Sequence, residues 1–160
     1  MDETPEPWNE SYERLTPKLV LFARQWLARP QDAEDVVQEA FIRVWKRRDA
    51  GRFNDAYFFA ATRNAAIDHL RCRARREPGG YGERALFEPS EVPPVLLPQD
   101  VEAALAALPA EQREAVVLRI WGGLSFAEIG EVTKANTDTA ASRYRYGVSA
   151  LRKFFEPVSP

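Results

Sequence analysis

Apolar residues recur every three or four positions along most of this chain, which is the spacing of an amphipathic helix. The pattern predicts a first helix over residues 10–28, a second that begins with Asp32 as its capping residue, and a third over residues 56–76. Two shorter helices follow, one on each side of Pro109. No stretch shows the strict alternation of apolar and polar residues that a half-buried β-strand requires. The sequence therefore predicts an all-α fold.

A Pro-rich segment, residues 77–99, interrupts the helical pattern with five prolines and three glycines. Such a composition is typical of a flexible linker, and at ~3.1 Å per residue this one could extend over roughly 70 Å. We expect it to join two small helical domains, over residues 1–76 and 100–156.

Two short helices joined by a tight turn are predicted between Leu124 and Arg152. Ser125 and Glu128 have the spacing of a capping box at the start of the first helix, and Asn136 is placed to cap the second. One face of the second helix is apolar, and the other carries short polar groups, arginine and tyrosine. This pattern is typical of a helix-turn-helix whose second helix enters the DNA major groove, but an ordinary amphipathic hairpin with a solvated face shares it.

Charge is distributed unevenly, although the formal net charge is only -2. Residues 43–76 hold ten Lys or Arg against three Asp or Glu, a balance of +7, and residues 134–153 hold five against one, or +4. Residues 2–39 hold four against nine, or -5, and residues 77–100 hold one against five, or -4. Two basic zones separated by acidic ones indicate two separate surfaces that contact phosphate.

Composition argues against several classes of protein. Cys72 is the only cysteine, so no internal disulfide can form, and Cys72 with His69 cannot make an ordinary four-ligand metal site. No run approaches the eighteen or so apolar residues of a membrane span, and the acidic N-terminus is unlike a secretion signal, so we expect a cytoplasmic protein. Asp68 and His69 are the one candidate acid–base pair, but neighbours on a helix point about 100° apart. We therefore predict no catalytic residues, no metal and no cofactor.

The third predicted helix combines aromatic residues at its start with arginines towards its end. Aromatic rings stack on unpaired bases and arginines bind phosphates, so this surface suits single-stranded nucleic acid. Aromatic residues at helical spacing are more often part of a core, however. We expect at least one of Tyr57, Phe58 and Phe59 to be buried, and the spacing does not say which.

The second predicted helix has a wide apolar band and, beside it, a polar stripe. The stripe contains Asp35, Gln38, Glu39 and Arg43. Such a stripe either contacts a partner or is simply solvated, and the residues alone do not decide between the two.

Together these motifs resemble the extracytoplasmic-function group of bacterial sigma factors, the smallest members of the sigma-70 superfamily. The stretch DAEDVVQEAFIRVWKR, residues 32–47, is similar to the second conserved region of that family. The stretch RNAAIDHLRCRARR, residues 63–76, is similar to the end of the same domain, and residues 108–152 are similar to the fourth region. The order and spacing of the three stretches, with a Pro-rich linker between them, make the resemblance specific.

The resemblance implies a promoter-specificity subunit of bacterial RNA polymerase that has no catalytic activity of its own. In this family the second helix docks on the coiled-coil clamp of the largest polymerase subunit. By position, the residues implied in that contact are Asp35, Gln38, Glu39, Phe41 and Arg43. The third helix and its preceding loop hold the opened minus-10 strand of the promoter. The residues implied there are Asn54, Tyr57, Phe58, Phe59, Arg63, Asn64 and Arg71.

The resemblance further implies that the helix-turn-helix reads the minus-35 duplex, with the flap of the second-largest polymerase subunit as a neighbour. The residues implied in DNA contact are Thr137, Thr139, Ala141, Ser142, Arg143, Arg145 and Tyr146. An anti-sigma factor, a nucleoid-associated location and a linker threaded through the RNA exit path are implied as well. The two promoter elements lie roughly two helical turns apart, ~70 Å, which the extended linker could span.

Several residues depart from the family pattern, among them Lys134, Ala141, the aromatic start 57–59 where Trp is frequent, and Ala60 where Arg is frequent. Lys134 occupies a turn position that usually holds glycine, so the turn is either strained or different in geometry. Ala141 stands where Lys or Arg is common, which removes one contact to DNA. A rival interpretation is a free-standing helix-turn-helix repressor. Such repressors normally dimerise on two half-sites, and no predicted helix is left over for a dimer interface.

Overall fold

The computed structural model describes residues 6–50, 53–76 and 98–156. Within these ranges the chain forms seven α-helices and one short 3-10 helix, and no β-strand. The all-α prediction is therefore confirmed. The chain divides into two compact units, Met1–Glu88 and Pro89–Pro160, and each is described by itself. Apart from its last two residues, the predicted linker 77–99 lies outside the described residues.

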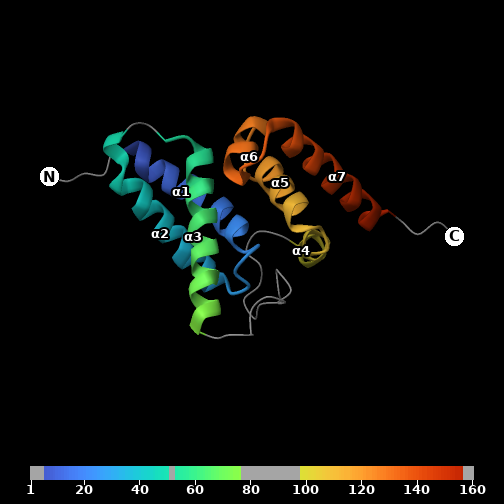
Figure 1. Cartoon of the computed structure of the whole chain (residues 1–160), viewed down its shortest axis with the longest axis horizontal. Coiled ribbons are helices and arrows are strands. Elements are labelled where there is room, and N and C mark those ends of the chain that lie inside the picture. Colours follow the sequence, from blue (N-terminus) through green and yellow to red (C-terminus); the bar gives the residue numbers. More distant parts are fainter. Residues whose placement is uncertain (1–5, 51–52, 77–97, 157–160) are drawn as a thin grey trace. The chain divides into compact units, whose positions relative to one another are not determined.

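The described part of the first unit contains three α-helices, and each of them contacts the other two (Figure 1). They are α1 (Glu6–Ala23), α2 (Pro30–Lys46) and α3 (Asp55–Arg76), with the 3-10 helix η1 (Arg48–Ala50) following α2. In Figure 1, α1 and α2 run side by side and α3 packs across both.

The core of the first unit is built from the apolar faces that the helical spacing predicted. Side chains of α1 meet the valines of α2 and the aromatic start of α3, and all of them are almost fully buried. Each large apolar side chain contributes about 1.5–3 kcal/mol when buried, so this core is what holds α3 against α2. Its main members are Leu15, Leu19, Phe22, Val36, Val37, Ala40, Val44, Phe58 and Phe59.

Helix α1 differs from the predicted helix at both ends. It begins at Glu6 rather than residue 10, and it ends at Ala23 rather than residue 28. Beyond Ala23 the chain turns tightly, because the N–H groups of Gln25 and Trp26 donate to the carbonyls of Phe22 and Ala23. Trp26 still packs on Phe22, with ring centroids 4.9 Å apart. The apolar spacing therefore continues past the end of the helix.

Helix α2 begins two residues before its predicted cap. Pro30 is its first residue, because proline already has a helical φ angle and needs no N–H partner in the first turn. The capping position belongs to Arg29, whose side chain makes no capping bond. Asp32 lies in the first turn, and its carboxylate accepts a hydrogen bond of 2.8 Å from Arg73 of α3. The prediction that Asp32 caps the helix was wrong: the residue joins the start of α2 to the end of α3.

Over residues 98–156, the second unit contains four helices: α4 (Gln99–Ala106), α5 (Ala110–Ile120), α6 (Phe126–Thr133) and α7 (Thr137–Phe155). The last three contact one another in every pair, and α4 contacts α7. Arg113 of α5 is buried and donates a hydrogen bond of 3.0 Å to the carbonyl of Leu108, just after α4. Burial lowers the pKa of this guanidinium, which nevertheless remains charged because arginine titrates so high. In the described part of the chain, no helix is long and apolar enough to cross a membrane.

Helices α6 and α7 are capped as the sequence predicted. The hydroxyl of Ser125 accepts from the N–H of Glu128 at 3.1 Å, and the Glu128 carboxylate accepts from the N–H of Ser125 at 3.0 Å, which completes a capping box. The side chain of Asn136 accepts from the N–H of Thr139 at 2.7 Å at the start of α7. These local bonds fix where each helix of the pair begins.

The turn between α6 and α7 requires a left-handed residue, and Lys134 provides it. Its φ of 59° and ψ of 44° lie in the region that glycine adopts without steric cost. The expected alternatives were a strained turn or a different geometry, and the structure shows the strained turn. The turn can still pack closely against α6 because residue 130 is glycine. A Cβ at that position would lie only 2.5 Å from the carbonyl oxygen of Ala135.

Candidate nucleic-acid interface

A basic groove lies between α2 and α3 and encloses about 420 Å³. We call it the α2–α3 groove. Two cations of α2 and the cation that directly follows it line one side, and a tyrosine, an asparagine and two alanines of α3 line the other. The volume and the lining suit an unpaired base with its phosphate, because the groove offers positive charge, an aromatic ring and an amide together. The lining residues are Arg43, Val44, Lys46, Arg47, Tyr57, Ala60, Ala61 and Asn64.

The start of α3 is positioned for this groove by several side chains. The side chain of Asn54 accepts from the N–H of Tyr57 at 3.1 Å and so caps the start of α3. Tyr57 stacks on Phe53, with ring centroids 4.2 Å apart. Its hydroxyl accepts a hydrogen bond of 3.2 Å from Arg47, the C-cap residue of α2. The ring of Tyr57 is therefore held at the groove by groups from both of its sides.

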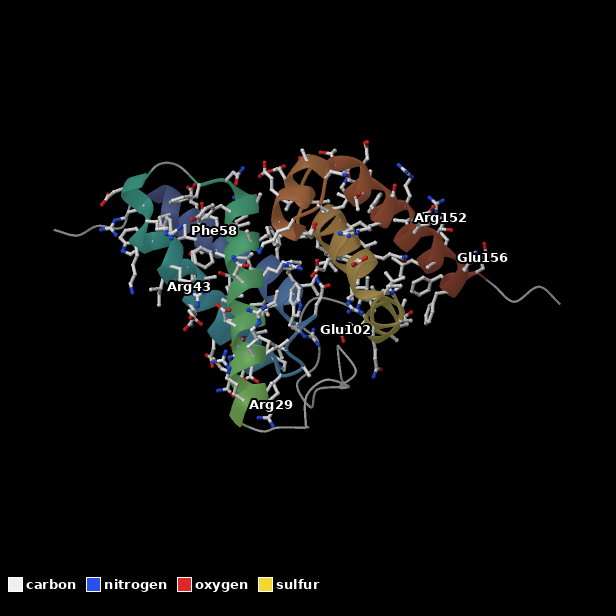
Figure 2. The ribbon with its side chains drawn as sticks, in the orientation of Figure 1. Arg29, Arg43, Phe58, Glu102, Arg152 and Glu156 are labelled. Carbon is white, nitrogen blue, oxygen red and sulfur yellow. The ribbon has the colours of Figure 1, made fainter. Side chains whose placement is uncertain are left out.

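Phe58 and Phe59 do not line the α2–α3 groove, contrary to the set that the family resemblance implied. Phe58 is 3% exposed and Phe59 is 1% exposed. Phe58 packs among the aromatic rings of Trp8 and Phe41, and it lies inside the first unit in Figure 2. Phe59 packs on Phe22, with centroids 5.5 Å apart. Their rings support α3 from beneath and have no free face to offer a flipped base.

The remaining residues of the implied minus-10 set lie at or near the surface. Asn64 is exposed and lines the groove. Asn54 and Arg71 are also exposed, but they lie outside its lining. Arg63 is partly buried, with its guanidinium 5.9 Å from the centre of the Trp26 ring. The set is thus divided between the groove and the flanks of α3.

Lys46 and Arg47 are groove residues that the sequence reasoning did not select. Both follow the apolar band of α2, and both are exposed. Arg48, next in the chain, instead lies over the Trp45 ring at 4.1 Å and donates to the Trp45 carbonyl. A signal was available, because three consecutive cations at the end of a helix within the +7 zone mark a phosphate-binding end.

The polar stripe of α2 is exposed, as a docking surface requires. Asp35, Gln38 and Glu39 all face solvent. Phe41 is 4% exposed and belongs mainly to the core, so only a small part of its ring is open to a partner. Arg43 is directed towards α3, where it lies 3.5 Å from a carboxylate oxygen of Asp68.

An apolar groove of about 440 Å³ borders this stripe, between α1 and α2. The sequence reasoning did not select it, because its two walls come from different helices and their packing has no local signal. Ile42 is 54% exposed beside it and is the large apolar residue that the fold leaves most open on α2. The residues of this α1–α2 groove are Trp8, Asn9, Tyr12, Gln38, Phe41, Ile42 and Trp45.

The recognition face of α7 carries the predicted residues with different degrees of exposure. Tyr146 is 68% exposed, and Arg145 and Thr137 are also exposed. Arg145 donates a hydrogen bond of 3.2 Å to the Ser142 hydroxyl, which preorients its guanidinium. Four members of the set are only partly exposed, and the N–H of one of them, Thr139, is used by the Asn136 cap. The partly exposed residues are Thr139, Ala141, Ser142 and Arg143.

Metal ligands are not clustered in the described part of the chain: no three His, Cys, Asp or Glu side chains there lie close enough to hold an ion. Cys72 is exposed on α3 and is a free thiol.

Comparison with protein families assigns both units. The family profile described as Sigma-70 region 2 matches residues 11–76, and the profile described as Sigma-70, region 4 matches residues 99–151. The two profiles therefore cover the helices that carry the α2–α3 groove and the helix-turn-helix.

Individual relatives agree with the profiles. The ECF RNA polymerase sigma factor SigE of Mycolicibacterium smegmatis is 32% identical over 157 residues, which covers 92% of this chain and 61% of that protein. SigL of Mycobacterium tuberculosis is 35% identical over 128 residues, covering 75% of this chain and 72% of SigL. The sigma factor RpoE of Bartonella quintana, crystallised with the anti-sigma factor NepR, has a similar structure, with a TM-score of 0.74 and 25% identity over 96% of this chain and 99% of that one. The chain thus belongs to the extracytoplasmic-function group of sigma-70 RNA polymerase sigma factors.

Proposed function

We propose that this sigma factor, which directs RNA polymerase to promoters, divides its contacts between its two units. The region over residues 1–76 docks on core polymerase and holds the opened minus-10 strand. The region over residues 100–156 reads the minus-35 duplex, and residues 77–99 link them. The observation that carries the proposal is the α2–α3 groove, because it brings cations, an aromatic ring and an amide together within a match to sigma-70 region 2.

For the minus-10 strand, we assign phosphate contacts to the cations and base contacts to the other side of the groove. Lys46 and Arg47 are exposed and can bind consecutive phosphates without further ordering of the backbone. Tyr57 offers a ring for stacking, and Asn64 offers an amide for a base edge. Unstacking a base costs a few kcal/mol, and stacking on protein aromatic groups returns about 1–3 kcal/mol per base.

For polymerase, the exposed stripe of α2 and the α1–α2 groove form one continuous surface, because Gln38 belongs to both. The stripe supplies acidic groups at Asp35 and Glu39, and the groove supplies the apolar contact that an acidic rim alone would lack. A helix of the polymerase clamp with basic and apolar residues is the complementary partner. The flap of the second-largest subunit is the proposed neighbour of the second unit.

For the minus-35 element, α7 is the recognition helix. The N-terminal half of α7 is held by the Asn136 cap, and Arg145 and Tyr146 project from it with little cover. Arginine forms a bidentate pair with guanine in the major groove, and such a pair discriminates against a wrong base by about 1–3 kcal/mol. Arg143 lies 3.7 Å from the carboxylate of Glu111, which holds its guanidinium away from the exposed Arg145 and Tyr146. We therefore assign Arg143 to the DNA backbone rather than to a base edge.

Regulation by an anti-sigma factor is proposed by analogy with the relative that was crystallised in such a complex. A cytoplasmic, nucleoid-associated location follows from the proposed partners, since polymerase and promoter DNA are found there. Both points concern the whole protein and extend beyond the contacts of the described residues.

A run-off transcription assay tests the proposed function. Core polymerase with and without this chain is supplied with genomic promoter fragments, and the transcript starts are sequenced. The chain should create new, shared start sites, and Lys46→Ala with Arg47→Ala should reduce their use several-fold by removing two phosphate contacts. Arg29→Ala, at the opposite end of α2, is the matched control for lost charge. Unchanged start sites upon addition of the chain would refute the proposal.

A further inference from the structure

Arg43, labelled in Figure 2, lines the α2–α3 groove and contacts two carboxylates. Its Nη2 donates to Oε1 of Glu39, one turn earlier on α2, at 2.7 Å. Its Nη1 lies 3.5 Å from Oδ2 of Asp68 on α3. The side chains of Arg43, Glu39 and Asp68 are 42%, 51% and 53% exposed, so all three are accessible to a partner.

The two carboxylates overcompensate the charge of Arg43. Two negative groups around one positive group leave a local balance of -1 at a groove whose other charged lining groups, Lys46 and Arg47, are positive. A phosphate that approaches Arg43 therefore meets its two carboxylate partners as well. In the free chain, Arg43 contributes little to the attraction of a nucleic-acid strand.

Glu39 connects this cluster to another surface. It belongs to the exposed α2 stripe that we assign to polymerase docking, whereas Arg43 belongs to the groove that we assign to the minus-10 strand. One ion pair of 2.7 Å thus links the two surfaces. Asp68 is not among the contacts assigned to either surface, and the proposed function assigns it no role.

We propose that the bridge Glu39–Arg43–Asp68 couples polymerase docking to single-strand binding, an inference that rests on the proposed function. When a cationic group of polymerase engages Glu39, Arg43 loses its closer partner and its charge becomes available to a phosphate in the groove. Asp68 is a positioning residue: it keeps the guanidinium over the groove when Glu39 is engaged elsewhere. The coupling is reciprocal, because a strand that engages Arg43 equally frees Glu39 for polymerase.

The size of the coupling is limited by the exposure of the pair. Exposed ion pairs of this kind shift equilibria by about 1.5- to 5-fold at moderate salt. The coupling should therefore be a few-fold at low ionic strength, and it should weaken as salt is added.

The free chain provides the first test, with a fluorescent oligothymidine strand as the probe. Asp68→Asn and Glu39→Gln should each raise the affinity of the chain for the strand about 1.5- to 5-fold, whereas Asp68→Glu, which keeps the charge, should behave like the unmodified chain. Glu34→Gln removes an exposed carboxylate from α2 outside the bridge and controls for net charge. The proposal is overturned if Glu34→Gln gives the same gain, or if Asp68→Asn gives its gain in an Arg43→Ala background as well.

The holoenzyme provides the second test. The ratio of strand Kd values between Arg43→Ala and the unmodified chain should be a few-fold larger in the holoenzyme than in the free chain. Glu39→Gln should remove that difference, because it frees Arg43 in both states. If the ratio of Kd values is the same in the free chain and in the holoenzyme, the coupling is overturned, even if the holoenzyme still starts transcripts at the shared sites. Loss of those start sites in the run-off assay would instead overturn the proposed function.

Discussion

Arg14 of α1 and Asp55 of α3 form a bidentate pair, with two N–H···O hydrogen bonds of 2.8 Å each, although 41 positions separate them in the sequence. The pair fixes the first residue of α3 to α1, two residues before Tyr57, which lines the α2–α3 groove. Two parallel bonds orient the partners better than one, so this pair positions the groove as well as stabilising the first unit.

Arg14→Ala should destabilise the first unit by about 0.5–1 kcal/mol, the upper range for a solvent-exposed ion pair. Urea unfolding followed by tryptophan fluorescence measures this unit mainly, because Trp8, Trp26 and Trp45 lie in it and Trp121 alone lies in the other. Arg14→Lys, which keeps the charge and loses the bidentate geometry, is the matched control and should fall in between. Equal stability of all three proteins would show that the pair contributes nothing.

The same pair predicts a pH dependence. The hydrogen bonds from Arg14, opposed in part by burial, hold the pKa of Asp55 below its usual value. A carboxyl whose folded pKa is depressed contributes stability above its unfolded pKa of about 3.9 and loses it as the pH falls through the lower folded pKa. The difference in unfolding free energy between the unmodified chain and Arg14→Ala should therefore be constant from about pH 5 to 7 and shrink below about pH 4. A constant difference down to pH 2 would contradict the assignment.

Lys134→Gly should stabilise the second unit by about 0.5–1 kcal/mol. A left-handed conformation costs an L-residue about 1–2 kcal/mol, and the greater unfolded-state freedom of glycine cancels part of the gain. Lys134→Ala removes the same charge but keeps the steric cost, so it should not stabilise. Hydrogen exchange of the α6 and α7 amides reports the opening free energy of this unit, and equal protection in both variants would argue against strain at φ 59°.

Gly147→Ala should destabilise the second unit by about 1–3 kcal/mol through overpacking. A Cβ at this position would lie 2.6 Å from Cγ2 of Val116, and that short side chain of α5 cannot move far. Val116→Ala removes the obstructing methyl groups, so the double variant should be more stable than the sum of the single effects predicts. Strict additivity in the same exchange measurement would mean that α7 shifts away from α5 instead.

Phe58→Ala and Phe59→Ala should each cost the first unit about 3–5 kcal/mol, as is typical for a buried phenylalanine. Transcription should then fall on closed and on pre-opened promoter templates alike, because the unit unfolds. Phe58→Leu, which keeps most of the volume, should restore both. Selective loss on closed templates with an unchanged unfolding free energy would indicate direct participation in strand opening.

The aromatic start of α3 shows where the sequence stops being informative. Three consecutive helical residues point about 100° apart, so at least one of Tyr57, Phe58 and Phe59 had to face the core. Which ones do so depends on where α1 and α2 lie, and those positions are set by packing that has no local signal. The caps at Ser125 and Asn136 were predictable because their partners are three residues away. The groove was not, because its walls come from two helices whose register is set by long-range packing.

Long-range ion pairs were likewise invisible in the sequence. Asp32 has the right type and position for a cap, but Pro30 starts the helix earlier, and Arg73 lies 41 residues away at a suitable distance to bind the carboxylate. The run of cations at residues 46–48 is visible in the sequence, but the family resemblance placed the strand-binding residues on α3 and in the loop before it. The helices and the chemistry of each zone could therefore be predicted, whereas the partners of individual charged side chains required the fold.

Arg145→Ala should weaken binding to minus-35 duplex by about 1–3 kcal/mol and relax the preference at one base pair, while binding to core polymerase stays intact. The guanidinium is exposed and preoriented by Ser142, so its loss removes a base contact without disturbing the core. Arg145→Lys keeps the charge but not the planar fork, and it should recover non-specific affinity without the base preference. Arg152→Ala, at the far end of α7 in Figure 2, is the charge control. Fluorescence anisotropy measures the duplex affinities. If they fall equally for Arg145→Ala and Arg152→Ala, α7 contacts phosphates only and does not read bases.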